Sequence, residues 1–349
     1  MDKKPASVGR APRQSNFELL RITAMMLVLI VHADYWSLGV PRFDMAASHG
    51  ANVFVRVLFE MLSVVCVNVF VMISGWFGIK ASVRGYANFA FQCLYFMLGI
   101  YLVMLFSGQT QFCLREMARC LFGSWFIQAY TVLYIISPVL NAYVRAASRR
   151  QLCITTGLLL AFQALFDLDG ISRFVLAGYT PLSFVSLYLL ARMLRLYGGS
   201  SARYGLSVYF LSVGLNVGLA YAAGLSGAGW LPSPVSYANP LVVAGAAGLV
   251  LAFSRLRLRP SGFVNMVAKS SFAVYLLHQH LLVGGAYFAP CMKTLYRHYD
   301  GIACLLLMGL ACAGWFAAAV VLDRPRIWLW RLLCAIIPRL RRAVASRPF

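Results

Sequence analysis

Long apolar stretches separated by short polar segments run along the whole chain. Each stretch is about 18 to 28 residues long, the length at which a helix crosses the hydrocarbon core of a bilayer. The pattern predicts ten membrane-spanning helices at about 17–38, 52–79, 86–106, 119–144, 152–168, 174–194, 204–224, 237–254, 270–290 and 302–322. We therefore expect an all-α fold, a polytopic transmembrane helix bundle.

The composition agrees with this pattern. Hydrophobic residues make up 61% of the chain and charged residues 12%, and the mean hydropathy is +0.75, values that are typical of a membrane protein and exclude a water-soluble domain. The formal net charge of +21 could suggest a nucleic-acid partner. However, the basic residues form short clusters between the apolar stretches, which is the arrangement of loops beside a membrane. Membrane lipid, and not nucleic acid, is the expected partner.

The distribution of the basic residues predicts the orientation. If the N-terminus is cytoplasmic, 23 of the 31 Lys and Arg residues lie in inner segments and six lie in outer ones. This bias predicts that both termini face the cytoplasm. Three parts are expected: a basic cytoplasmic segment at 1–16, an integral membrane domain at 17–322, and a basic tail at 323–349. The tail alternates Arg with Trp328, Trp330 and aliphatic residues, which favours an amphipathic helix on the inner leaflet over a plain charged tail.

Two ionisable residues lie inside the first apolar stretch. Arg21 and His32 are eleven residues apart, which in a helix is a rise of about 16 Å and a turn of about 1100°, or roughly 20° past three full turns. Both side chains should therefore lie on one face. Ionisable residues within a span are costly and usually mark a functional pathway. The alternative is an arginine that snorkels at a helix end and a histidine hydrogen-bonded between helices.

The second stretch carries a further group of polar residues. Arg56 and Glu60 are four residues apart and can neutralise one another. Glu60 and His32 are expected at similar depths, so the carboxylate could orient the imidazole as a general base. Farther inward, Ser74 and Gly75 form either a polar site or a simple small-residue helix contact.

The remaining histidines and cysteines do not indicate a metal site. His278 and His280 are two residues apart, so in a helix they point about 200° away from each other and cannot both bind one ion. The nine cysteines include no C-x-x-C pair, and buried free thiols are the expected state. We expect no metal and no tightly bound cofactor.

Four segments, in this order, resemble the membrane acyltransferase-3 family. Arg21 to His32 has the family's R-x₁₀-H form, and residues 70–76 resemble its F-x-x-x-S-G-aromatic motif. Residues 125–138 are similar to its W-F-x-x-x-Y-x-x-L-Y-x-x-x-P segment, and residues 271–278 to its S-x-x-x-Y-L-x-H span. The chain is similar to the short, stand-alone members. It departs from many members in the loop after the Ser-Gly motif, where the dense basic cluster is reduced to Lys80 and Arg84.

The resemblance implies a sugar O-acyltransferase of the bacterial cytoplasmic membrane that takes acyl groups from cytoplasmic acyl-CoA. Acetyl-CoA is the expected co-substrate, and a saccharide or glycolipid the acceptor. The implied catalytic residues are His32, Glu60 and Arg21. The implied acyl-CoA-binding residues are Arg21, Ser74, Gly75, Lys80 and Arg84. On the acceptor side we expect Asp34, Trp36, Trp125 and His278.

Two other functions compete with the enzyme. A transporter or flippase for a glycolipid or a small organic acid would also use buried ionisable residues and glycine-interrupted helices. The sequence shows no pair of broken helices in matching halves, which disfavours it. A non-catalytic membrane anchor would have no use for His32.

Overall fold

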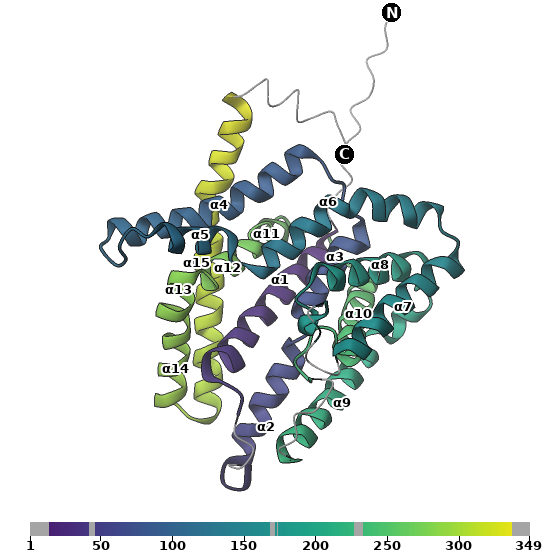
Figure 1. Cartoon of the computed structure of the whole chain (residues 1–349). Coiled ribbons are helices and arrows are strands. Elements are labelled where there is room, and N and C mark those ends of the chain that lie inside the picture. The colour runs from purple at the N-terminus through teal and green to yellow at the C-terminus, as the bar shows by residue number, and fades with distance from the viewer. Residues whose placement is uncertain (1–13, 42–45, 168–171, 173, 227–232, 337–349) are drawn as a thin grey trace, which may run out of the picture.

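A computed structural model describes residues 14–41, 46–167, 172, 174–226 and 233–336. Regular secondary structure in this part of the chain is helical (Figure 1). The elements are α1 (Ser15–Val31), the π-helix η1 (His32–Trp36), α2 (Ala46–Ser63), α3 (Cys66–Phe77), α4 (Val83–Phe106), α5 (Leu114–Phe122), α6 (Trp125–Ala146), α7 (Arg149–Asp167), η3 (Leu176–Gly178), α8 (Pro181–Tyr197), η4 (Ser201–Tyr204), α9 (Gly205–Ser226), α10 (Pro240–Arg255), α11 (Gly262–Ala268), α12 (Ser271–His278), α13 (Leu281–Val283), the π-helix η5 (Gly284–Phe288), α14 (Ala289–His298) and α15 (Gly301–Ile336).

Six helical segments of the described part are long and apolar enough to cross a membrane. They are Ser15–Trp36, Ala51–Phe77, Val83–Phe106, Trp125–Ala146, Ser201–Leu225 and Gly301–Ile336. The other four expected spans correspond to α7, α8, α10 and α12, which are shorter or more polar. The helical class expected from the hydrophobic pattern is confirmed, whereas the count of ten spans stays a prediction.

Helix α1 lies in the middle of the bundle. It contacts α2, α3, α10, α11, α12 and α15, and Figure 1 shows it crossing between the other helices. Its buried side chains include Leu20, Ala24, Val28 and Leu29, which recur at helical spacing and form one stripe. Because α1 touches helices from both halves of the chain, residues on its surface meet side chains that are far away in sequence.

Helices α3 and α8 pack closely at Gly75. A Cβ atom built on Gly75 would lie 2.6 Å from the carbonyl oxygen of Tyr188 and 2.9 Å from the Cβ of Ala191. Only a residue without a side chain allows the two backbones to approach this closely. Gly75 therefore lies in a close small-residue contact between α3 and α8, which was one of the two interpretations given for it from the sequence.

The stretch expected as one helix at 270–290 is interrupted. Helix α12 ends at His278, and His280 has an extended backbone with φ −59° and ψ 137° before the short helix α13 begins. The extended residue breaks the helical hydrogen-bond pattern and places Gln279 at a turn. One broken helix is thus present that the hydrophobic pattern did not reveal.

Helix α15 continues where the sequence suggested a separate tail. It runs for 36 residues through Pro325, with no break between residues 322 and 323. Asp323 and Arg326 are buried inside the bundle at 0% and 4% exposure. Two residues at the start of the expected surface tail are therefore buried in the bundle, and residues 337–349 lie outside the described residues.

Candidate active site

His32 stands where α1 changes its helical form. The α-helix ends at Val31, and His32–Trp36 form a π-helix with a wider turn. Such insertions occur frequently at functional sites, because the extra residue turns side chains away from the regular helical positions. The ring of Trp36 lies edge-on to His32, with ring centroids 5.9 Å apart.

His32 pairs with a second histidine from the other end of the chain. Its Nδ1 lies 2.9 Å from Nε2 of His278, and Nδ1 of His278 lies 2.6 Å from the carbonyl oxygen of Val274. The carbonyl can only accept, so Nδ1 of His278 carries a proton and, in the neutral ring, its Nε2 accepts. Nδ1 of His32 must then donate to it. This chain of contacts leaves the lone pair of His32 on Nε2.

Glu60 does not take the place expected for it. In the described residues no hydrogen bond joins Glu60 to His32, and Oε2 of Glu60 is buried with no hydrogen-bond partner. Arg56 does not pair with Glu60 either: its Nε donates to Oδ1 of Asp34 at 2.6 Å, and its other end donates to the carbonyl of Gly39. The expected contact with His32 is not made, because equal depth in two helices does not place two side chains on facing sides, and a catalytic role of Glu60 stays a prediction.

A cavity of about 250 Å³ surrounds His32. We call it the histidine cavity, and its walls are mostly aromatic. Trp125 lies against Tyr179, with ring centroids 4.5 Å apart, and is stacked on Tyr237 at 6.1 Å. The lining residues are Met25, Val28, His32, Trp36, Val67, Phe70, Trp125, Phe126, Tyr179, Tyr237, Phe272, Tyr275 and Gln279.

The residues expected on the acceptor side divide between two places. Trp36 and Trp125 line the histidine cavity, and His278 contacts His32 at its wall. Asp34 lies elsewhere, since it lines a different, mainly apolar cavity of about 470 Å³ together with Arg56. Its carboxylate is held by that arginine, so a structural ion pair accounts for it.

A third cavity, of about 460 Å³, is lined by several basic side chains. We call it the cationic cavity, after the four basic side chains Arg21, Lys269, Arg326 and Arg331 that line it. Ser74 lines it as well, and its hydroxyl lies 3.3 Å from that of Tyr130. Two of these cations are paired, because Arg21 donates to Glu18 at 2.6 Å and Arg326 to Asp323 at 2.8 Å.

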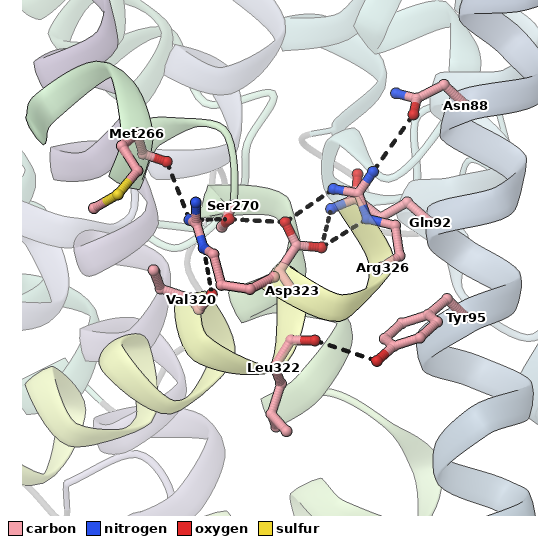
Figure 2. Close-up of polar contacts among 10 residues, drawn as sticks. Asn88, Gln92, Tyr95, Met266, Ser270, Val320, Leu322, Asp323 and Arg326 are labelled. Atoms are coloured by element: carbon pink, nitrogen blue, oxygen red, sulfur yellow. Dashed lines mark hydrogen bonds and ion pairs between the residues drawn. The ribbon is translucent and has the colours of Figure 1, made fainter. Parts of the chain in front are cut away.

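Arg326 is held in place by a buried network (Figure 2). Its Nε and Nη2 donate to the two carboxylate oxygens of Asp323 at 2.8 and 2.9 Å. Asp323 also accepts from Ser270 at 2.7 Å and from Gln92 at 3.5 Å. The remaining nitrogen, Nη1, lies 3.4 Å from Oδ1 of Asn88 on α4. The carboxylate thus stabilises the guanidinium at the cavity wall.

Three residues expected to bind the donor do not line the cationic cavity. Gly75 faces α8, and Lys80 and Arg84 are exposed in and just after the loop between α3 and α4. Arg84 is one turn before Asn88, so it lies on the α4 face that leads to the cavity. Lys269, Arg326 and Arg331 were not selected from the sequence, although their place in basic inner segments was a signal for them.

The cationic cavity and the histidine cavity share three lining residues. Phe70, Phe126 and Phe272 line both of them, so the cationic cavity and the histidine cavity meet at these rings. Arg21 lines the first and His32 the second, about 16 Å apart along α1 by helical rise. The arrangement brings a cavity lined by basic side chains next to the cavity that contains His32.

The chain is similar to a known family over nearly its whole length. A family model, Acyl_transf_3, described as an acyltransferase domain, matches residues 14–337. No curated protein and no solved structure matches the chain. The matched range covers nearly all described residues and extends beyond the boundary expected at residue 322.

Proposed function

The chain belongs to the acyltransferase-3 family, and from this membership and the site geometry we propose that it is an acyl-CoA-dependent O-acyltransferase acting on a saccharide. The observation that carries the proposal is the histidine pair beside a cavity that adjoins a cationic cavity. Acetyl is the acyl group we propose, and the bacterial cytoplasmic membrane the location. A hydroxyl of a cell-surface or lipid-linked sugar is the acceptor.

His32 acts as the general base in this proposal. Its Nε2 takes the proton of the acceptor hydroxyl while the hydroxyl oxygen bonds to the thioester carbonyl carbon, whose π electrons move to oxygen. When the carbonyl re-forms, the carbon–sulfur bond breaks, and the thiolate takes the proton from His32. An ester and free CoA result. His278 is a positioning residue that accepts from Nδ1 of His32 and so keeps Nε2 available.

The cationic cavity is the proposed site for the phosphates of the donor. Lys269 and Arg331 have no acidic partner among the described residues, and Arg21 and Arg326 present guanidinium groups suited to bidentate phosphate contacts. A pantetheine arm of roughly 15 to 20 Å matches the rise of about 16 Å between Arg21 and His32. The arm would pass Phe70, Phe126 and Phe272, and the thioester would reach the histidine cavity.

The aromatic walls of the histidine cavity support a sugar acceptor. Stacked or edge-on rings such as Trp36, Trp125 and Tyr237 provide apolar faces with polar edges, which suits the alternating apolar and hydroxyl faces of a pyranose. The asymmetry of the basic residues supports a cytoplasmic position for the cationic cavity. Donor and acceptor would then approach His32 from opposite sides of the membrane.

The experiment uses inverted membrane vesicles that contain the full chain, supplied with radiolabelled acetyl-CoA. We expect label in the saccharide fraction as base-labile ester, and His32→Ala to lower it by about 10² to 10⁴, the range for losing a general base. His278→Ala should also lower it, and His278→Gln should restore part, because the amide oxygen accepts the same proton. His298→Ala is the control, since His298 is exposed and outside both cavities. Wild-type labelling in His32→Ala would end the catalytic role of His32.

The same vesicles separate the enzyme from the transporter. A transporter would move a glycolipid or an organic acid and leave no covalent label in the saccharide fraction. If the wild type transfers no acetyl group but moves either solute across the membrane, a transporter replaces the acyltransferase as the proposed function.

A further inference from the structure

The break after α12 places a polar residue against the histidine cavity. Gln279 follows His278 directly, has φ −98° and ψ 7°, and precedes the extended residue His280. Its backbone N–H donates to the carbonyl of Tyr275 at 3.0 Å, which fixes the turn. Gln279 lines the histidine cavity together with His32.

The two neighbours of Gln279 have structural contacts on both ring nitrogens. His278 contacts Val274 and His32. Nε2 of His280 lies 3.0 Å from the carbonyl oxygen of Met97, and its Nδ1 accepts from the backbone of Leu282 at 3.2 Å. Hydrogen bonding within the protein therefore accounts for both histidines.

The side-chain amide of Gln279 is different. Its Nε2 is buried and has no hydrogen-bond acceptor among the described residues. A buried donor without a partner destabilises the folded protein, so its presence beside a cavity points to a ligand that supplies the acceptor.

We propose that the Gln279 amide is the hydrogen-bond donor that stabilises the oxyanion of the tetrahedral intermediate. The inference rests on the proposed acyl transfer. When the acceptor oxygen bonds to the thioester carbon, the carbonyl oxygen becomes negative and accepts from Nε2, and the charge returns to the carbonyl bond as sulfur leaves. Gln279 thus acts as a catalytic residue, because it contacts the reacting atoms.

Two other polar groups of the cavity, the Tyr275 hydroxyl and the His32 imidazole, are less suited to this role. The hydroxyl of Tyr275 is already 3.0 Å from that of Ser124. Among the residues that line the cavity, His32 is the one ionisable base, and it must hold the acceptor proton at the moment when the oxyanion forms. A neutral amide donor beside it adds no charge that would oppose this protonation.

The test compares Gln279→Met with Gln128→Met in the vesicle assay. Methionine keeps the length of the side chain but has no N–H donor, and we expect kcat to fall by about 10² to 10³, with the KM for acetyl-CoA changed less than about threefold. Gln128 is exposed, its amide donates to Phe122 outside the cavity at 2.6 Å, and Gln128→Met should keep the wild-type kcat. Gln279→Asn, which keeps the amide on a shorter chain, should recover part of the loss.

The readouts distinguish a failure of the oxyanion role of Gln279 from a failure of the proposed acyl transfer. If the wild type transfers acetyl groups and Gln279→Met keeps kcat within about threefold, the oxyanion role is wrong and the acyltransferase proposal stands. A rise in KM with unchanged kcat also overturns the role, because it indicates ground-state binding. A wild type without transfer contradicts the proposed function itself. Acetyl-CoA binding measured on each purified variant shows that the variant is folded, and Gln279→Leu, which also lacks an N–H donor, replaces Gln279→Met if the latter does not bind.

Discussion

Removal of the Asp323 carboxylate is expected to destabilise the bundle strongly. Asp323 is fully buried and accepts from Arg326 at 2.8 and 2.9 Å, from Ser270 at 2.7 Å and from Gln92 at 3.5 Å. Asp323→Ala leaves the guanidinium of Arg326, 4% exposed, without its counter-charge. Loss of one partner of a buried pair costs about 3–5 kcal/mol. We expect the free energy of unfolding to fall by that amount.

Replacement of both partners should have a different effect. The double variant Asp323→Leu with Arg326→Met removes the charge and the counter-charge together, and such replacements are often neutral or stabilising by about 1–4 kcal/mol. The double variant should therefore be more stable than Asp323→Ala. It should also bind acetyl-CoA more weakly than the wild type, because Arg326 lines the cationic cavity.

The assay is denaturant unfolding in micelles followed by tryptophan fluorescence, with acetyl-CoA binding measured on the same samples. Asp300→Ala removes an exposed carboxylate just before α15 and should cost less than about 1 kcal/mol. A loss below about 1 kcal/mol in Asp323→Ala would refute the reasoning, since Arg326 would then not depend on its partner. A double variant as unstable as Asp323→Ala would refute it as well.

Other expectations concern the donor site, the helix contact and the orientation. Arg21→Ala and Lys269→Ala should each weaken acetyl-CoA binding, Arg21→Lys should recover it in part, and Lys80→Ala should leave it unchanged; equal losses in all four would contradict the assignment of the cationic cavity. Gly75→Ala should lower the free energy of unfolding by about 1–3 kcal/mol without a change in acetyl-CoA affinity, and a selective loss of affinity would return Gly75 to the donor site. The exposed thiol of Cys113 should react with a membrane-impermeant maleimide in intact cells, and labelling only in inverted vesicles would reverse the orientation.

The sequence predicts the faces of helices better than it predicts which faces meet. The apolar stripe of α1 and the common side of Arg21 and His32 follow from the helical period alone. The partner of His32 does not, because His278 is 246 residues away and the choice between it and Glu60 depends on the rotation of each helix in the bundle. Periodicity along one helix contains no information on that rotation.

The polar residues of the later helices illustrate the same limit. The basic character of the segments that hold Lys269 and Arg326 was visible, but the close approach of these segments to Arg21 results from the tertiary packing around α1. The break at Gln279 was hidden because its flanking residues are apolar enough to continue a span. The sequence does contain one sign of the break, which is the pair of polar residues Gln279 and His280 at the middle of an apolar stretch.

The three phenylalanines between the cavities have an electrical consequence. If the cationic cavity and the histidine cavity open to opposite sides of the membrane, as proposed, the voltage drop falls mainly across the apolar layer at Phe70, Phe126 and Phe272, where they meet. Moving one elementary charge through that drop requires about 2.3 kcal/mol per 100 mV. If the donor lies as proposed, its phosphates remain on one side of the layer, and only an uncharged thioester arm passes through it. The acyl group then crosses without electrical work, so the rate of transfer should not depend on the membrane voltage.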